Sequence, residues 1–179
     1  APVALYDITR KNLSMADPSR PGTTIPVGEQ SSRGLELAAT WLMTNNLRLS
    51  GNWALVDAKY DKFVENVGGV GVSRAGNRPT NIPKQVGNLW VAYTPIANLE
   101  VGGDLRYVSS RYADTANTVY DDAYTLLGAY AAYTFDKRTR VTARIKNLTD
   151  KVYAESFSGS SMMYLGAPRM LDVSIQTAF

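Results

Sequence analysis

Eight segments of this chain alternate apolar and polar residues with a period of two. The final segment shows the pattern most clearly, with Leu171, Val173 and Ile175 on one parity and polar residues between them. A strand with one apolar and one polar face packs on a core or faces lipid across a barrel wall. The predicted strands are 3–12, 32–43, 47–63, 85–94, 99–111 and 124–135, followed by a terminal pair that begins at Thr139 and after Arg169.

The connections between these segments alternate between short and long. Short turns are predicted at 44–46, 95–98 and 136–138, and long loops at 13–31, 64–84, 112–123 and 158–169. Outer-membrane barrels have short periplasmic turns and longer extracellular loops, whereas a soluble domain has no reason to gather its long loops at one end. The pattern therefore predicts an all-β fold, an antiparallel up-and-down meander of about eight strands in a transmembrane β-barrel. A soluble all-β domain is the alternative that the pattern alone leaves open.

The composition excludes several classes of chemistry. The 179 residues contain neither Cys nor His, which excludes disulfides, thiolate or histidine metal sites and His-dependent hydrolysis. The net charge of +3 is scattered and forms no basic run, so no nucleic-acid partner is expected. No run of about 18 apolar residues predicts a transmembrane helix, and no leader-like segment opens the chain.

Aromatic residues favour a membrane wall over a soluble core. Tyr is abundant, with 11 residues against 4 Phe, and its ring combines an apolar body with a polar tip. Such rings are enriched where a barrel meets the membrane interface. The candidates for these girdles lie near predicted strand ends, at Trp41, Tyr60, Tyr93, Tyr107, Tyr133 and Tyr153.

Two motifs resemble catalytic or phosphate-binding sites, and neither fits its context. The glycine-rich stretch 68–74 lacks a Gly-Lys-Ser/Thr ending and a following helix, so it is interpreted as a flexible loop. The adjacent carboxylates Asp121 and Asp122 point oppositely in an extended chain and are interpreted as a hydrated loop end. We therefore expect no enzymatic activity, no cofactor and no metal site.

The long loops carry basic and aromatic residues that would form a mouth at one rim. Arginine guanidinium groups and aromatic rings bind anionic or catecholate-like small ligands through charge-assisted hydrogen bonds and stacking. The candidate ligand-binding residues are Arg74, Arg78, Arg111, Tyr112, Tyr120, Met163 and Tyr164, with Met162 beside them. Solvated or mutually packed loop residues are the alternative interpretation for each one.

Several motifs together resemble the TonB-dependent outer-membrane ferric-siderophore receptors. The most specific are KNLTDKVY at 146–153, GAPR at 166–169 and the terminal Phe179. The family has Phe where this chain has Thr149. Further similarity lies in DITRKN at 7–12 with Asp17-Pro18, SRGLEL at 32–37, DAKY at 57–60, and NIP at 81–83 leading to NLWVAY at 88–93.

The resemblance implies both a fold and a role. The intact family has a 22-stranded barrel closed by an N-terminal plug, and it imports ferric siderophores with energy transmitted by the TonB complex. Residues 1–179 would be the C-terminal portion of such a barrel, without the plug domain, in the outer membrane of a Gram-negative bacterium. The implied partners are a ferric siderophore, the TonB complex through the missing plug, outer-membrane lipid and the barrel-assembly machinery, which would read Phe179.

Eight strands also equal the number in a complete small barrel. A self-contained eight-stranded outer-membrane protein with a structural or adhesion role is therefore the main alternative function, and a soluble all-β binding module is a third. An open sheet would leave two costly edges in lipid. The chain must then close on itself, pair with another copy or belong to a larger assembly.

Overall fold

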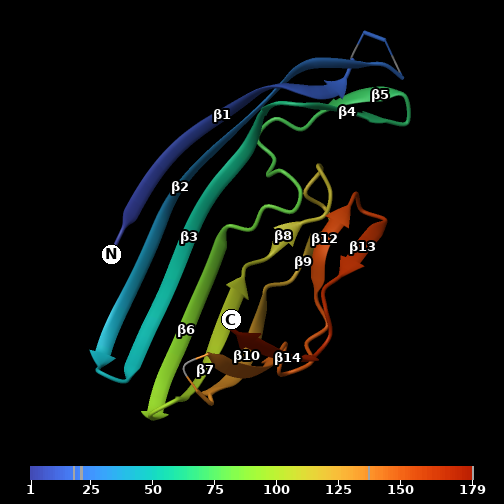
Figure 1. Ribbon diagram of the computed structural model, residues 1–179. Helices are drawn as coiled ribbons and strands as arrows, with labels where there is room; N and C mark the ends of the chain where they lie inside the picture. The colour runs from blue at the N-terminus through green and yellow to red at the C-terminus, as the bar shows by residue number, and fades with distance from the viewer. Residues whose placement is uncertain (18, 21, 137, 179) are drawn as a thin grey trace.

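Eight long antiparallel strands form one curved sheet in a computed structural model that describes residues 1–17, 19–20, 22–136 and 138–178 (Figure 1). The strand order is β1-β2-β3-β6-β7-β10-β11-β14, an up-and-down meander as predicted. The strands are β1 (Val3–Ala16), β2 (Thr24–Thr44), β3 (Leu47–Lys62), β6 (Gln85–Ile96), β7 (Leu99–Val108), β10 (Tyr124–Thr134), β11 (Thr139–Lys146) and β14 (Met170–Thr177).

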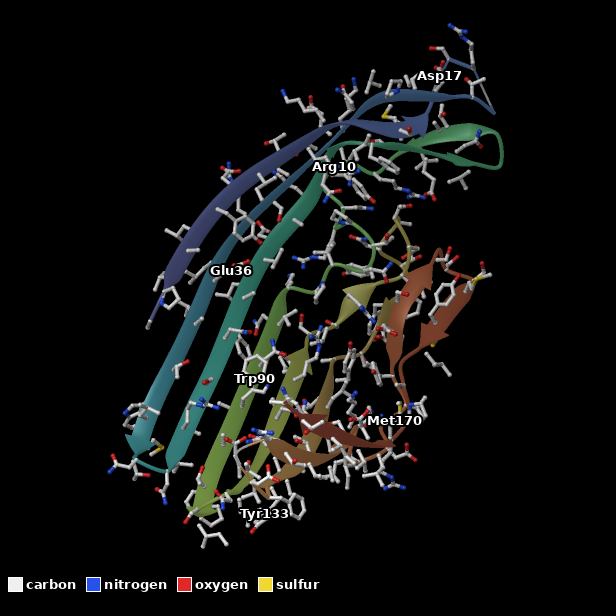
Figure 2. The ribbon with its side chains drawn as sticks, in the orientation of Figure 1. Arg10, Asp17, Glu36, Trp90, Tyr133 and Met170 are labelled. Atoms are coloured by element: carbon white, nitrogen blue, oxygen red, sulfur yellow. The ribbon has the colours of Figure 1, made fainter. Side chains whose placement is uncertain are left out.

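Three of the four long connections contain short hairpins. In the described part of the chain these are β4 (Val64–Val67) with β5 (Val70–Ser73), β8 (Arg111–Tyr112) with β9 (Tyr120–Asp121), and β12 (Ala154–Ser158) with β13 (Met162–Leu165). Figure 1 shows all three at the end of the sheet opposite the short turns. The predicted gathering of long connections at one rim is therefore confirmed. Figure 2 places Asp17 at this rim and Tyr133 at the opposite end.

The register puts the apolar parity of all eight strands on a single face. Odd-numbered residues pair with odd-numbered residues across the middle of the sheet, so that Leu37 pairs with Trp53 and Leu89 with Leu105. At the far edge, Ile145 pairs with Leu171. We call the surface formed by these odd-numbered positions the apolar face. Its side chains remain open to the surroundings, and Leu171, Val173 and Ile175 are 70%, 62% and 71% exposed.

The even-numbered positions form the opposite, polar face. Glu100 accepts hydrogen bonds there from Arg140 at 3.0 Å and from the hydroxyl of Tyr130 at 3.1 Å. Asn88 donates to Asn52 across β3 and β6 at 2.8 Å. Polar side chains on this face satisfy one another across strands, as expected for a wetted barrel interior.

Three of the predicted aromatic girdle residues lie where the pattern placed them. Trp41, Tyr93 and Tyr133 are exposed on the apolar face beside the short turns. Tyr107 also lies on this face, stacked on Trp53 with ring centroids 5.6 Å apart.

The other two girdle predictions are wrong. Tyr60 has even parity and is buried at 8% exposure, stacked on Phe63 with ring centroids 4.4 Å apart. Tyr153 follows the end of β11 and packs on Tyr124 with ring centroids 4.7 Å apart. Neither ring lies among the girdle positions of the apolar face.

The first predicted long loop is mostly strand. Pairing between β1 and β2 continues to Met15 with Ile25 and Ala16 with Thr24. The register between β1 and β2 is irregular on both sides of Leu13. The alternation of apolar and polar residues is interrupted there, although the two strands stay paired beyond it.

The glycine-rich stretch 68–74 is also more ordered than predicted. Gly68 and Gly69 have φ of 61° and 89° and form the two-residue turn between β4 and β5.

The seventh strand ends at Lys146, earlier than the sequence indicated. Asn147 has φ of 49°, and its buried side chain accepts from the amide of Lys151 and donates to the carbonyls of Lys151 and Ala167. Asp150 accepts from the amide of Arg169 at 2.8 Å. The two motifs at 146–153 and 166–169 therefore form one turn in space, which positions the start of β14.

The sheet is open in the described residues. Strands β1 and β14 are its two edges, and no pairing joins them within residues 1–17, 19–20, 22–136 and 138–178. This arrangement does not support a self-contained eight-stranded barrel. No helix of the described residues is long and apolar enough to cross a membrane. The predicted assembly signal at Phe179 lies outside the described residues.

Candidate functional site

The connections that follow β1, β3, β7 and β11 form a surface that we call the loop rim. It contains all seven candidate ligand-binding residues, which come from three different loops. The short hairpins contain only two to five residues per strand, so backbone ladders alone join little of this surface. Side chains that bond to the backbone of a neighbouring loop hold the rim together.

Asn117 joins the loop after β7 to the loop after β3. Its side chain donates to the carbonyl of Arg78 at 2.9 Å and accepts from the amide of Arg78 at 2.8 Å. Asn77 adds a bond in the same region, donating to the carbonyl of Thr115 at 2.8 Å. Asn117 has φ of 60°, a conformation that Asn tolerates better than most residues.

Asn81 joins the loop after β3 to the hairpin β12–β13. Its amide nitrogen donates to the carbonyl of Phe157, and its amide oxygen accepts from the backbone N–H of Phe157, both at 2.8 Å. This is the hydrogen-bond pattern of a strand pair, made by one side chain. Asn81 also donates its own backbone N–H to the carbonyl of Tyr112 at 2.9 Å. One residue thus contacts both neighbouring loops.

Arg111 joins the loop after β7 to the base of β12. Its guanidinium donates to the carbonyl of Ala154 at 2.6 Å and lies 3.7 Å from a carboxylate oxygen of Asp121. The rings of Tyr124 and Phe157 lie 5.9 Å and 5.7 Å from its Cζ. Arg111 is 7% exposed, and among the described residues its Nε has no hydrogen-bond partner. A buried cation with an unused donor is held chiefly by rings, one carbonyl and one carboxylate.

The two other predicted arginines are also engaged within the protein. Arg74 forms a close ion pair with Glu65, with Nε and Nη2 both 2.8 Å from Oε2. Arg78 is 7% exposed and lies 3.8 Å from Asp57. Burial lowers the pKa of the Arg78 guanidinium, although the neighbouring charge of Asp57 counteracts part of the shift. The described structure therefore does not present these arginines as free cations at the surface.

The exposed members of the predicted set are aromatic or sulfur-containing. Tyr120, Met163 and Tyr164 are 65%, 54% and 52% exposed. Met162 accepts a hydrogen bond from the hydroxyl of Tyr164 at 3.3 Å and is itself exposed. Tyr112 pairs with Tyr120 in the hairpin β8–β9 and is half-buried. The structure brings the seven residues to the loop rim, where the three arginines are paired within the protein and Tyr120, Met163 and Tyr164 are exposed.

Two carboxylates in the loop after β7, Asp114 and Asp121, have shifted pKa values for different reasons. Burial raises the pKa of Asp114, but hydrogen bonds from Thr118 and Val119 outweigh it and hold the pKa below its ordinary value. Burial raises the pKa of Asp121 and outweighs the attraction of Arg111. The interpretation of Asp121 as a hydrated loop end is wrong, since its side chain is only 21% exposed and faces Arg111.

Sequence reasoning missed the three asparagines at positions 77, 81 and 117. Positive φ at Asn81 and Asn117 gives a local reason for Asn, but their partners lie 76 and 39 residues away. Contacts between residues so far apart in the sequence produce no periodic pattern that sequence analysis could detect. No cluster of three or more Asp, Glu, His or Cys side chains that could hold a metal ion is found in the part of the chain that the structure describes.

Comparison with known proteins gives consistent matches along the whole chain. The family model described as TonB dependent receptor-like, beta-barrel matches residues 3–148. The ferrichrome outer membrane transporter/phage receptor of Escherichia coli is 28% identical over 94% of this chain and 22% of its own length. The metal-pseudopaline receptor CntO of Pseudomonas aeruginosa is 30% identical over 97% of this chain and 24% of its own length.

Solved structures agree in fold. The siderophore receptor PiuA of Acinetobacter baumannii superposes with a TM-score of 0.81 at 26% identity, over 97% of this chain and 25% of that protein. The ferric preacinetobactin receptor BauA from the same species gives a TM-score of 0.78 at 29% identity, over 98% and 26% of the two chains. The 179 residues thus span about a quarter of the length of these four relatives.

Proposed function

Because this chain belongs to the TonB-dependent receptor β-barrel family, we propose that it serves in the binding and import of a ferric siderophore across the outer membrane, with energy transmitted by the TonB complex. In this proposal residues 1–179 are the C-terminal portion of the barrel. The remaining strands, the plug and the TonB contact are supplied by parts of the protein outside these residues. The family consists of receptors and transporters rather than enzymes.

The observation that supports this function best is the combination of an open two-faced sheet with one loop rim. The apolar face suits lipid, the polar face suits a wet interior, and the two free edges require further strands. The relatives are roughly four times as long as the match, which agrees with a larger barrel. The alternative of a complete small barrel lacks this support, because β1 and β14 do not pair in the described structure.

For ligand contact we propose the exposed layer of the loop rim. Tyr120, Met163 and Tyr164 would pack against a chelate through ring faces and thioether sulfur. Tyr112 would support Tyr120 from the neighbouring strand. Arg74, Arg78 and Arg111, which the sequence suggested as direct ligand contacts, are proposed to hold the loops that carry these side chains, because each is paired with a carboxylate. Phe179 is proposed as the residue read by the barrel-assembly machinery.

Uptake of radiolabelled ferric chelates by cells that carry the intact parent gene tests the function. We expect uptake of one chelate class among hydroxamates, catecholates and carboxylates, and its loss in cells without TonB. The test of the proposed contacts is the double variant Met163→Ala, Tyr164→Ala, which should reduce uptake about tenfold without reducing the amount of receptor at the surface. Absence of uptake for every class, with normal surface expression, would contradict the siderophore assignment.

A further inference from the structure

The polar face contains a hollow of about 500 Å³ on its short-turn half. Three of the charged residues that line it, Arg48, Glu100 and Arg140, are each the second residue of a strand that follows a short turn. Small residues form its floor, where Ala92 pairs with Gly102 across β6 and β7. The hollow is lined by β2, β3, β6, β7, β10 and β11, all internal strands, so it does not depend on the open sheet edges. Its volume lies in the range of ordinary small-molecule pockets.

One row across five strands places an arginine on either side of this hollow. The cross-strand pairs run from Arg48 to Ala92, then to Gly102, Tyr130 and Arg144. The ring of Tyr130 leans over Gly102, since a Cβ atom added at that glycine would collide with it. The Cζ atom of Arg144 lies 5.2 Å from the centroid of the same ring. The row therefore has a guanidinium group at each end, with small residues and one ring between them.

The charges of Arg48 and Arg144 are not balanced by a carboxylate of this surface. The carboxylate of Glu100 is already engaged by Arg140 at 3.0 Å. Asp172 lies opposite Arg144 on β14. Within the residues that the structure describes, however, neither Arg48 nor Arg144 forms an ion pair with any carboxylate. The hollow therefore has an excess of positive charge on a wet wall.

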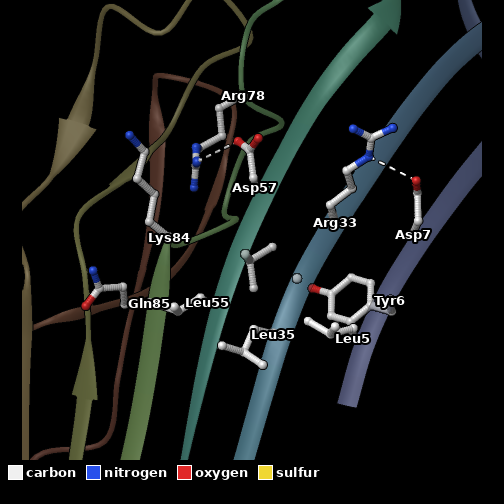
Figure 3. Close-up of a pocket in the computed structure, with 12 residues that line it drawn as sticks. Leu5, Tyr6, Asp7, Arg33, Leu35, Leu55, Asp57, Arg78, Lys84 and Gln85 are labelled. Atoms are coloured by element: carbon white, nitrogen blue, oxygen red, sulfur yellow. Dashed lines mark hydrogen bonds and ion pairs between the residues drawn. The ribbon is translucent and has the colours of Figure 1, made fainter. Parts of the chain in front are cut away.

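Arginines near the loop rim show the contrast. Figure 3 shows Arg33 paired with Asp7, where Nε lies 3.0 Å from a carboxylate oxygen, and Arg78 facing Asp57 at 3.8 Å. Arg48 is exposed and has no such partner in the described part of the chain. Unpaired guanidinium groups that line a water-filled passage favour anions.

Trp90 adds an aromatic surface to the same hollow. It has even parity and is 44% exposed on the polar face, whereas Trp41 and Trp53 have odd parity and lie on the apolar face. Trp90 pairs with Ser50 and Asp104, one row nearer the loop rim than the two arginines. Figure 2 shows it on β6, between the short turns and the loop rim. An exposed indole on a wet surface is suited to stacking on a flat ligand.

We propose that Arg48, Arg144 and Trp90 form a second ligand site on the inner wall of the barrel, for a flat organic anion with acidic groups at two ends. Each guanidinium group would bind one acidic group, and the indole would stack on the ring system between them. With the short turns on the periplasmic side, this site lies below the loop rim, on the route of an anionic chelate moving inward. The inference rests on the proposed function for that route and adds a binding site to it.

Isothermal titration calorimetry of the intact receptor in detergent tests this site. The probes are naphthalene-2,6-dicarboxylate and its uncharged dicarboxamide, which share a flat ring system and differ in charge. We expect the dicarboxylate to bind about a hundredfold more tightly, with about tenfold from each charge-assisted contact. Arg48→Gln and Arg144→Gln should each reduce this preference to about tenfold, and the double variant should abolish it. Arg106→Gln, at an exposed arginine on the polar face of β7 outside the hollow, should leave it unchanged.

Substitutions of Trp90 test stacking separately from charge. Trp90→Ala should weaken the binding of both probes about fivefold and leave the ratio of their affinities unchanged. Trp90→Phe keeps an aromatic face and should retain most of the affinity. Heat-modifiable electrophoretic mobility shows whether each variant has folded, so that a loss of binding is attributed to the hollow.

Three results would overturn the proposal. The first is an equal affinity of the wild type for the two probes, or a preference that survives the double arginine variant. The second is a preference that is lost in the variant Met163→Ala, Tyr164→Ala, because the probe then binds at the loop rim. The third is the absence of binding to the intact receptor, as expected if an acidic segment from the rest of the protein covers the two guanidinium groups.

Import separates this inference from the proposed function. If ferric-chelate uptake is normal but the dicarboxylate binds without preference, the inner site fails and the function stands. If the dicarboxylate binds with the expected preference but no class of chelate is imported, the function fails and the anion site stands without the transport route.

Discussion

The strand wall and the loop rim are stabilised in different ways. In the wall, backbone ladders satisfy the polar groups, and the parity of a residue decides whether it meets the apolar or the polar face. In the rim, single side chains such as Asn81 and Arg111 bond to the backbone of another loop. The wall therefore tolerates many sequences of the correct pattern, whereas the rim depends on individual residues. This difference predicts where substitutions are costly and how far their effects extend.

A charge on the apolar face should produce the largest loss. Val173→Arg places a guanidinium on the lipid-facing side of β14, where an arginine costs about 2–4 kcal/mol near the bilayer midplane. Ser174→Arg, one residue away on the polar face, should cost less than about 1 kcal/mol. Denaturant unfolding of the intact receptor in lipid vesicles measures both. Equal destabilisation by the two variants would contradict the assignment of faces.

Loss of the Asn81 clamp should have a smaller and local effect. Asn81→Ala removes two hydrogen bonds to Phe157 and places Ala at a φ of 64°, for a combined cost of about 2–3 kcal/mol. Asn81→Gly also loses the two hydrogen bonds, but glycine adopts this positive φ without strain, so the variant should cost about 1 kcal/mol less. Hydrogen exchange of the β12–β13 segment should accelerate in both variants.

The control for this clamp lies in the same loop. Asn66 accepts only a local bond from the amide of Gly69, at 2.8 Å. Asn66→Ala should therefore loosen the β4–β5 turn and leave exchange in β12–β13 unchanged. If Asn66→Ala accelerates exchange in β12–β13 as much as Asn81→Ala does, the rim is not held by the specific contact of Asn81.

Titration of Asp121 should give the smallest effect. Burial raises its folded-state pKa above the ordinary value of 3.8, so the folded rim binds this proton more tightly than the unfolded chain. The stabilisation is therefore complete below about pH 3.8 and is lost as the pH rises through the raised pKa. After division by the intrinsic exchange rate at each pH, opening of β8–β9 should become faster across that window. Asp121→Asn should remove this dependence, and a slope that persists in the variant would assign it to another group.

The fold was accessible from sequence because its wall is periodic. Leu171, Val173 and Ile175 indicated their face directly, and seven of the eight strands begin within a residue or two of where the pattern placed them. The failures occur where parity is interrupted. A bulge near Leu13 hid the pairing of β1 with β2, so the start of β2 was placed eight residues too late, at Ser32 instead of Thr24. A positive φ at Asn147 ended β11 early.

The site was accessible only in part. Loop composition located Tyr120, Met163 and Tyr164 at the rim, and the structure shows them exposed. The pattern could not show that Arg78 and Arg111 are buried, because their partners Asp57 and Ala154 come from other segments. The same holds for Asn81, whose partner is 76 residues away. Contacts of this kind depend on the folded loops and have no local signal.

The turn made by Gly68 and Gly69 lies at a hairpin tip, beyond every contact that joins the loops, and Gly159 occupies the corresponding place between β12 and β13. Residues added at these two tips would extend outward without stretching the bonds made by Asn81, Asn117 or Arg111. We therefore expect insertions to be tolerated best at these tips. New recognition surfaces can arise there while the bases of the hairpins keep their geometry.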